Sequence, residues 1–192
     1  MDLSAESVGR LVEAYPDTQP LAGVEADHLE MLPSTLESGS YGRRDVEWIV
    51  QWYYRRFLGD YPDAERREAE DAFSDNEFDD IRRAIDGALQ RETTGARLEC
   101  LTDLTGVDVS VATAFLQFLD PKTYLVLSET EWESLRRCGE LSKQYPSRPS
   151  SADYDRYLRV CRSVSDRCEC TLQTLYRALW QIQIGQGRAD SD

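Results

Sequence analysis

The sequence predicts an all-α protein with an orthogonal arrangement of helices, and three observations support this fold class. Apolar residues recur at helical spacing along most of the chain, most clearly at Val46, Ile49, Val50, Tyr53 and Phe57. No segment shows the strict alternation of apolar and polar residues that is typical of a half-buried strand. Glycine, proline and serine gather between the periodic segments, where helices are expected to end.

The chain has 192 residues, of which 41% are hydrophobic, and this suits one domain with a substantial core. We expect residues 1–43 to form an N-terminal appendage, with one short helix within residues 2–15 and another near residues 24–31. Residues 44–184 are expected to form the main helical domain, and residues 185–192 a disordered tail.

Start and stop signals divide the first half of the main domain into helices. The first helix is expected to begin at Arg44 and to end before Gly59, and the polar stretch 63–71 predicts a solvated helix. Ser74-Asp75-Asn76-Glu77 has the pattern of a capping box, which predicts a helix start. A leucine-rich helix follows and is expected to end at Gly106.

The second half of the main domain continues the helical pattern. Residues 109–119 are almost continuously apolar and predict a buried helix. Ser128-Glu129-Thr130-Glu131 has the pattern of a second capping box. A proline- and serine-rich loop at 144–150 precedes two final helices, expected at about 151–165 and 171–184.

The charge is the strongest signal in the composition. Asp and Glu total 36 against 22 basic residues, which gives a net charge of −14. Only Lys122 and Lys143 are lysines. An acidic surface that is poor in strongly hydrated lysine is typical of proteins in concentrated salt, where the ions screen the self-repulsion. We therefore expect a salt-adapted protein, with an ordinary acidic protein as the alternative.

The cysteines and the single histidine limit which disulfides, metal sites and catalytic groups the chain can form. The five cysteines are an odd number, which disfavours a disulfide framework. Cys161, Cys168 and Cys170 lie close together, so either an iron–sulfur cluster or plain core packing could explain them. Cys161 falls on an apolar helical face, which favours packing. Because His28 is the only histidine, we expect no histidine-based metal site, no His-centred catalytic triad and no cofactor.

The chain carries no run of 18 apolar residues, and its first ten residues lack the basic and apolar pattern of a secretory signal. We expect a cytoplasmic protein that does not associate with a membrane.

The most informative stretch lies between residues 101 and 116. It predicts a helix, a tight turn and a second helix. Gly106 can adopt the left-handed conformation that ends the first helix, Val107 can fill the space between the helices, and Asp108 can cap the second. In a helix-hairpin-helix, the backbone N–H groups of such a turn can hold a DNA phosphate.

The segment 104–132, LTGVDVSVATAFLQFLDPKTYLVLSETEW, resembles the helix-hairpin-helix DNA glycosylase superfamily. The flanking segments VEWIVQWYYRRF (46–57) and TLYRALWQI (174–182) are similar to those of uncharacterised microbial relatives of that superfamily, so the resemblance covers most of residues 44–183. It implies a DNA-binding hairpin and a catalytic Asp at the start of the helix that follows.

The chain departs from this pattern where chemistry would occur. The resemblance places Ser110 at the position of a reactive group on the second hairpin helix, and Ser128 at the position of the catalytic Asp. A neutral hydroxyl cannot supply the missing negative charge, so Ser128 is expected to be a helix cap. Glu129 or Glu131 is the alternative acid. Asp108 replaces the second hairpin glycine, and its carboxylate repels a phosphate.

A cluster of aromatic residues and arginines lies between residues 48 and 56. Trp48 and Trp52 are one turn apart, and Arg55 and Arg56 follow. Such side chains can stack bases and bind phosphates, although an aromatic stripe is more often part of a core. The candidate nucleic-acid-binding residues are Gly106, Val107, Val109, Ser110, Arg55 and Arg56.

Three functions follow from the sequence, and we expect no catalysis in the first two. The chain is a nucleic-acid-binding protein without glycosylase activity, with DNA as its partner, or a structural domain that binds a protein partner or forms a homodimer. The third alternative is an enzyme with a relocated catalytic acid. A basic groove at the hairpin, an exposed apolar patch at Trp48 or Trp52, or an acidic pocket near Ser128 would distinguish them.

Overall fold

The computed structural model describes residues 2–189, and every regular element within them is an α-helix, which confirms the predicted fold class. The helices are α1 (Ala5–Glu13), α2 (Tyr15–Thr18), α3 (Ala22–Glu37), α4 (Arg43–Arg55), α5 (Asp63–Ser74), α6 (Phe78–Gln90), α7 (Thr94–Thr102), α8 (Val109–Leu119), α9 (Glu129–Arg137), α10 (Ser151–Arg167) and α11 (Leu172–Ala189). Among these described helices, none has the length and apolarity needed to cross a membrane.

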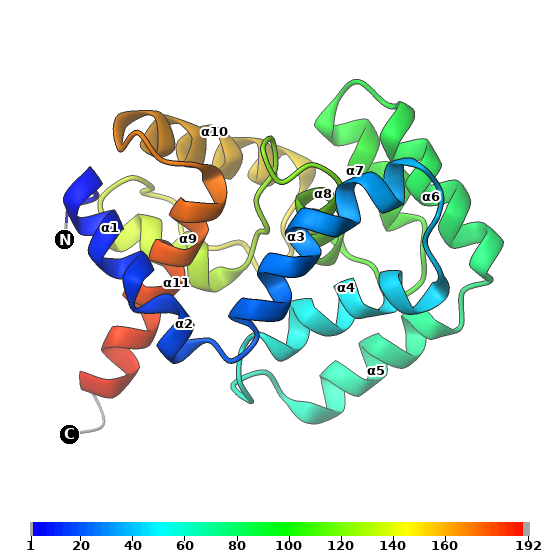
Figure 1. Ribbon diagram of the computed structural model, residues 1–192, viewed down its shortest axis with the longest axis horizontal. Helices are drawn as coiled ribbons and strands as arrows, with labels where there is room; N and C mark the ends of the chain where they lie inside the picture. The colour runs from blue at the N-terminus through cyan, green and yellow to red at the C-terminus, as the bar shows by residue number, and fades with distance from the viewer. Residues whose placement is uncertain (1, 190–192) are drawn as a thin grey trace.

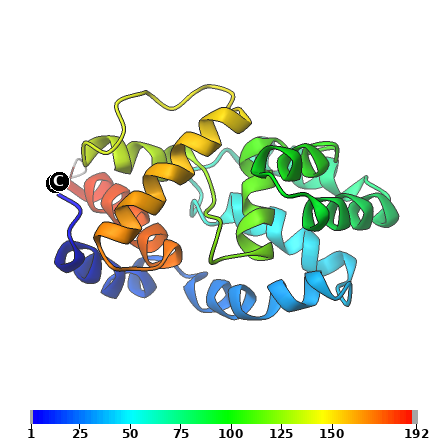
Figure 2. The same cartoon turned by 90° about the horizontal axis from the view of Figure 1, so that it is seen from above.

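The helices form two lobes (Figures 1 and 2). The first lobe contains α1, α2, α9, α10 and α11, and here α11 packs against helices from both ends of the sequence. The second lobe contains α3 to α8, with α8 packed against α3, α4 and α7. The chain passes from the second lobe to the first between α8 and α9, so the residues of this connection lie where the lobes meet.

Helix α8 is the centre of the second lobe. Every residue from Ser110 to Leu119 is buried, as the apolar run 109–119 predicts. In the turn before it, Gly106 has the expected left-handed conformation (φ +78°), and the Asp108 Oδ1 accepts a hydrogen bond from the backbone N–H of Val111. The preceding helix α7 ends at Thr102 and not at Gly106 as expected, so Gly106 belongs to the turn itself. The second lobe therefore has a rigid turn that presents the first residues of α8 to the space between the lobes.

The N-terminal segment is part of the common core. Leu3, Val8 and Tyr15 are buried in the first lobe, and Leu32 and Leu36 of α3 are buried in the second. Among the described residues, 2–43 share one continuous core with the rest of the chain. The expected appendage is thus a pair of short helices and one long helix that complete the two lobes.

Three details differ from the sequence expectations. Helix α3 has 16 residues, twice the length expected near 24–31, because its apolar face is buried against α8. No capping box forms at Ser74, because α5 continues through this residue and α6 begins only at Phe78. Helix α11 continues past Gly185 to Ala189, and residues 190–192 of the expected tail lie outside the described residues.

The connection between α8 and α9 is an irregular segment buried between the lobes. Leu125, Val126 and Leu127 have no exposed surface. Buried backbone groups require hydrogen-bond partners, and here side chains supply them. The N–H of Val126 donates to Gln117 Oε1 (2.8 Å), and the N–H of Leu127 donates to Thr113 Oγ1 (2.8 Å).

Helix α10 of the first lobe holds the same segment from the other side. The hydroxyl of Tyr154 donates to the carbonyl of Leu125 (3.0 Å), and the hydroxyl of Tyr157 donates to the carbonyl of Val126 (3.0 Å). Side chains from both lobes thus fix the buried segment, and they fix the position of Ser128 directly after it.

Candidate functional site

A pocket with a volume of about 410 Å3 lies where the two lobes meet. Its walls come from the end of α4 and the turn after it, the turn before α8 and the first turn of α8, the start of α9, the loop before α10 and the middle of α11. The lining residues are Tyr53, Phe57, Asp60, Tyr61, Asp108, Ser110, Ser128, Glu129, Thr130, Tyr145, Ser147, Pro149, Trp180 and Gln183. We call this the inter-lobe pocket.

Aromatic rings make up the apolar part of the inter-lobe pocket. The Phe57 ring lies 5.9 Å from Tyr53, 6.0 Å from Tyr61 and 5.9 Å from Trp180, measured between centroids. Tyr145 completes the set from the loop before α10. Phe57 therefore joins aromatic residues from α4, from the turn after it and from α11.

The polar part of the inter-lobe pocket comes from two helix starts. Ser110, in the first turn of α8, shares a hydrogen bond of 3.2 Å with the hydroxyl of Tyr145. Burial raises the pKa of Tyr145 to about 12, so this phenol stays protonated at neutral pH. Ser128 caps α9 by accepting a hydrogen bond from the N–H of Thr130 at 3.2 Å.

The lining carries one sign of charge. Three carboxylates, those of Asp60, Asp108 and Glu129, line the inter-lobe pocket, and the described residues that line it include no Lys or Arg. The Asp108 carboxylate already accepts the cap hydrogen bond of α8, whereas Glu129 is exposed at the start of α9. The surface that a ligand meets is thus acidic and aromatic.

A buried ion pair lies directly behind the pocket wall. Arg56 and Glu131 both have fully buried side chains, and Arg56 Nη1 lies 2.7 Å from Glu131 Oε1. The second carboxylate oxygen accepts hydrogen bonds from Arg56 Nη2 (3.4 Å) and from the Ser128 hydroxyl. Burial by itself lowers the pKa of Arg56, but the charge and hydrogen bond of Glu131 together with the neighbouring Tyr176 and Tyr53 raise it well above its ordinary value, so the guanidinium stays protonated.

Aromatic rings surround the Arg56 guanidinium. Its central carbon lies between 4.5 and 5.8 Å from five ring centroids, those of Trp52, Tyr53, Phe57, Tyr176 and Trp180. A cation over aromatic faces is stabilised by their quadrupoles, most strongly where water is excluded. Three of these residues, Tyr53, Phe57 and Trp180, also line the inter-lobe pocket, so the buried pair and the pocket share a wall.

A second buried carboxylate, that of Glu25 in α3, extends this network between the lobes. Glu25 Oε2 accepts hydrogen bonds from the hydroxyl of Tyr15 (2.8 Å), from the indole N–H of Trp52 (3.2 Å) and from the hydroxyl of Tyr176 (3.4 Å). The Tyr176 hydroxyl also accepts from Arg56 Nη1 at 3.4 Å. Polar groups of α3, α4, α9 and α11 thus form one connected network.

The raised pKa of Glu25 is expected to make the free energy of unfolding depend on pH. Burial raises the pKa of this carboxyl, against the opposing effects of the Tyr15 hydrogen bond and the Arg177 charge. A carboxyl whose pKa is higher in the folded chain contributes stability at low pH, and that contribution is lost as the pH rises through the folded pKa. The free energy of unfolding of the wild-type chain should therefore fall relative to that of Glu25→Gln as the pH rises. Urea denaturation of both chains at a series of pH values measures this difference, and a constant difference would contradict the prediction.

The predicted nucleic-acid-binding arginines do not face the pocket. Arg56 is fully buried in its pair with Glu131, so it cannot reach a phosphate at the surface, and this part of the prediction is wrong. Arg55 is about half exposed, but its guanidinium pairs with Glu70 of α5 at 3.2 Å. Adjacent residues of one helix point in different directions, and here only Arg55 points outward.

The predicted hairpin residues divide into two groups. Ser110 lines the inter-lobe pocket, whereas Gly106 packs against the backbone of α5 and Val107 is buried. Val109 is partly buried and does not appear among the residues of the pocket lining. Asn76 holds the turn in place, because its side chain exchanges two hydrogen bonds with the backbone of Thr105 (2.9 and 3.0 Å).

The two candidate catalytic acids, Glu129 and Glu131, lie in different environments. Glu129 lines the inter-lobe pocket, whereas Glu131 is buried behind it with both carboxylate oxygens engaged. Glu131 therefore serves the buried ion pair and cannot contact a bound molecule. No sequence pattern marks Tyr61, Tyr145 and Trp180 as pocket residues, because they come from three segments that only the tertiary structure brings together.

Trp48, Trp52 and Cys161, which the sequence singles out, pack within the protein and do not form a site among the described residues. Trp52 is buried, and Trp48 is partly buried with its ring stacked on His28 at 3.6 Å between centroids. Cys161 is buried in the core, as its apolar helical face predicts. Within the part of the chain that the structure describes, no three His, Cys, Asp or Glu side chains are grouped so that they could hold a metal ion.

Comparisons with known proteins return no match. Neither the family profiles, nor the curated proteins, nor the solved structures contain one that is similar to this chain at a significant level.

Proposed function

We propose that this chain is a non-catalytic binding protein whose inter-lobe pocket accepts a compact organic cation, such as a quaternary ammonium group. The observation that carries the proposal is the lining: aromatic rings together with three carboxylates and no basic side chain among the described lining residues. Aromatic faces and carboxylates both attract cations, and this combination is typical of sites for quaternary ammonium groups.

Size and hydrogen bonding fit the same class of ligand. A pocket of about 410 Å3 is at the lower end for small-molecule sites, so it suits a compact group. The exposed hydroxyl of Ser147 lines the pocket, and it can form a hydrogen bond with an oxygen of a ligand. A cation that also carries a hydroxyl group, such as choline, satisfies both requirements.

The engagement of Ser128 and Glu131, two of the residues at the position that the resemblance makes catalytic, favours binding over catalysis. The Ser128 hydroxyl donates to Glu131 and accepts from Thr130, so it is occupied as a cap. The Glu131 carboxylate is neutralised by Arg56. A nucleophile needs a neighbouring base that can accept its proton, and a carboxylate held by a buried guanidinium is a poor base.

A titration with choline and its neutral isostere 3,3-dimethyl-1-butanol tests this proposal. Because Trp180 lines the inter-lobe pocket, its fluorescence should change when choline binds, and the neutral isostere should bind at least about fivefold more weakly. Equal binding of the two compounds would show that the charge is not recognised. No binding of either compound at millimolar concentration would overturn the proposal.

Asp108→Asn is the matched variant. Asparagine caps a helix as well as aspartate does, so α8 keeps its start while the pocket loses one negative charge. We expect choline affinity to fall by about fivefold, which corresponds to roughly 1 kcal/mol for one charge at about 4 Å in water. Asp155→Asn removes an exposed charge from α10 outside the pocket lining, and it should leave the affinity unchanged. An equal loss in both variants would indicate only the general charge of the protein.

Nucleic-acid binding is a second candidate, and it rests on the glycosylase resemblance. That resemblance implies that the start of the second hairpin helix and the start of the next helix line one site, and Ser110 and Ser128 do line the same pocket. The acidic lining counts against it, because carboxylates repel phosphates. In concentrated salt, the ions around a salt-adapted protein would screen this repulsion. The same ions would also weaken any attraction to DNA.

Binding to single-stranded, duplex and abasic DNA at low and at molar salt tests the second candidate. Arg55→Ala is the suitable surface variant, because Arg56 is buried. Binding that weakens with salt and with Arg55→Ala would support it. The interaction-domain alternative receives less support: among residues 2–183 the exposed large hydrophobic residues are only Val24, Met31 and Leu58, and the expected patch at Trp52 is buried.

A further inference from the structure

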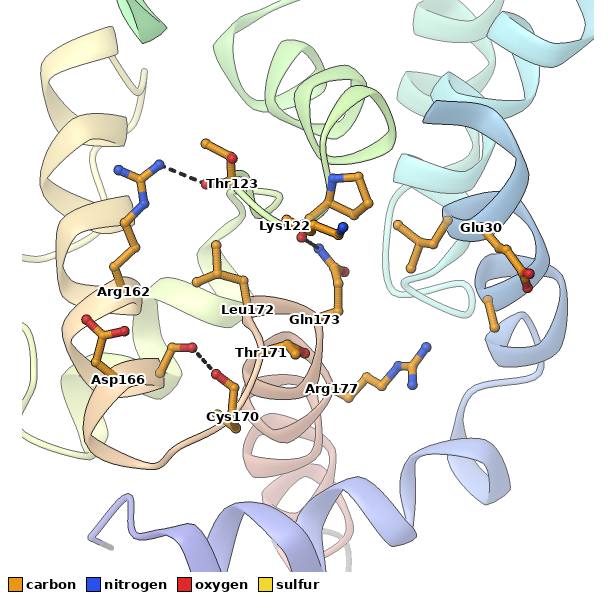
Figure 3. A pocket seen from close by; sticks show the side chains of 14 residues that line it. Glu30, Lys122, Thr123, Arg162, Asp166, Cys170, Thr171, Leu172, Gln173 and Arg177 are labelled. Atoms are coloured by element: carbon orange, nitrogen blue, oxygen red, sulfur yellow. Dashed lines mark hydrogen bonds between the residues drawn. The ribbon is translucent and has the colours of Figure 1, made fainter. Parts of the chain in front are cut away.

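A second and larger cavity, with a volume of about 830 Å3, lies on a different face of the meeting point of the lobes. Figure 3 shows it between α3, α10, the start of α11 and the segment that follows α8. It shares no lining residue with the inter-lobe pocket. We call it the basic cavity, for the following reason.

The charge of its lining is opposite to that of the chain. Acidic residues outnumber basic residues 36 to 22 in the whole sequence, but Lys122, Arg162 and Arg177 line this cavity against Glu30 and Asp166. The carboxylate of Glu30 points away from the other labelled side chains (Figure 3). Three cations from three separate segments thus line one cavity in an acidic protein, with Arg162 on the side of α10 and Arg177 pointing toward α3 (Figure 3).

Two of these cations, Lys122 and Arg162, make no ion pair among the described residues and are available to a ligand, whereas Arg177 is paired with the buried Glu25. Lys122 makes no ion pair among the described residues, and Arg162 donates one hydrogen bond to the neutral carbonyl of Thr123 at 2.8 Å. Arg177 lies 3.8 Å from Glu25, and its Nε has no hydrogen-bond partner. The positive charge around the cavity is therefore only partly neutralised, in contrast to the paired arginines of α5 and α9.

Further groups in the wall define the ligand more closely. Helix α11 begins at Leu172 in the wall, so the positive end of its dipole adds to the cationic side chains. The Nε2 of Gln173 donates hydrogen bonds to two backbone carbonyls. Its buried Oε1 has no partner and can accept a hydrogen bond. Leu29 and Leu172 provide apolar surface. An anion that also carries hydroxyl groups and an apolar or flat part fits these features.

We propose that the basic cavity binds a small phosphorylated molecule with free hydroxyl groups, of nucleotide size. The negative charge of the ligand is attracted by Lys122, Arg162 and Arg177, a ligand hydroxyl donates to Gln173 Oε1, and the apolar or flat part of the ligand lies on Leu29 and Leu172. The volume of about 830 Å3 is within the range of such sites.

Calorimetric titration with ADP, adenosine, ribose 5-phosphate and inorganic phosphate tests this inference. We expect ADP to bind, adenosine to bind at least about tenfold more weakly, and inorganic phosphate to compete with ADP. Ribose 5-phosphate distinguishes recognition of the sugar phosphate from recognition of the base. Equal binding of ADP and adenosine would overturn the role of the cations, and no binding of any of the four compounds would overturn the site.

The two lysines of the chain provide a matched pair of variants. Lys122→Ala removes an unpaired cation from the basic cavity, and ADP affinity should fall by about tenfold. Lys143→Ala removes the same charge from an exposed pair with Asp153, and affinity should not change. An equal loss in both variants would show that binding is non-specific. Asp108→Asn should leave ADP binding intact, so failure at the basic cavity and failure at the inter-lobe pocket can be told apart.

Discussion

Replacement of Arg56 with alanine is expected to lower the free energy of unfolding by about 3–5 kcal/mol, because it leaves Glu131 charged, buried and without its partner. The loss includes the contacts of the guanidinium with five aromatic rings. Urea denaturation followed by circular dichroism measures the change.

Arg55→Ala is the matched control, because it removes the same side chain from the next position. Its pair with Glu70 is partly exposed, so the expected loss is below about 1 kcal/mol. A double variant, Arg56→Met with Glu131→Leu, replaces both charges with apolar side chains and should recover much of the stability lost in Arg56→Ala. If Arg56→Ala and Arg55→Ala lost equal stability, the buried pair would not have the importance that its burial implies.

Gly106→Ala is expected to destabilise the chain by about 3 kcal/mol, and two independent effects contribute. The residue has φ +78°, a conformation that costs an L-residue roughly 1 kcal/mol or more. In addition, an added Cβ would lie 2.7 Å from the backbone nitrogen of Phe73 and 2.9 Å from the carbonyl oxygen of Ala69. Backbone atoms of a packed helix cannot move aside cheaply, so the turn and α5 must separate.

Gly139→Ala isolates the first of these effects. Gly139 has φ +77°, but no atom lies within 4 Å of an added Cβ. We expect a loss of about 1 kcal/mol, from the conformation alone. Thermal unfolding of the two variants measures the difference, and equal losses would mean that the contact between the turn and α5 relaxes without cost.

The features that the sequence predicts well are those with local causes. Gly106, Asp108 and the apolar run 109–119 together specify a turn, a cap and a buried helix, and all three are present. Helix α3 is different, because Gly23 and Pro33 disfavour a helix in isolation. Its stability comes from the burial of its apolar side chains against α8, which a local pattern does not contain.

The candidate site shows the same limit. Two neighbouring arginines suggest a basic surface, but Glu131, the partner of Arg56, lies 75 residues away in sequence. Asn76 lies inside the segment 74–77 that matches a capping pattern, whereas its side chain holds a turn 29 residues further on. Pairing between distant polar side chains decides these roles, and no spacing rule in one sequence reveals it.

The way residues 125–127 are held has a consequence for how the molecule moves. Hydrogen bonds from α8 and from α10 converge on this strap of backbone, so a hinge rotation between the lobes would have to break bonds on at least one side of it. We therefore expect no hinge closure of the two lobes around a ligand. We also expect both lobes to unfold together in one cooperative transition. A ligand of either proposed site would then enter without a closing motion of the lobes. The residues at the entrance of each cavity would determine which ligands can enter.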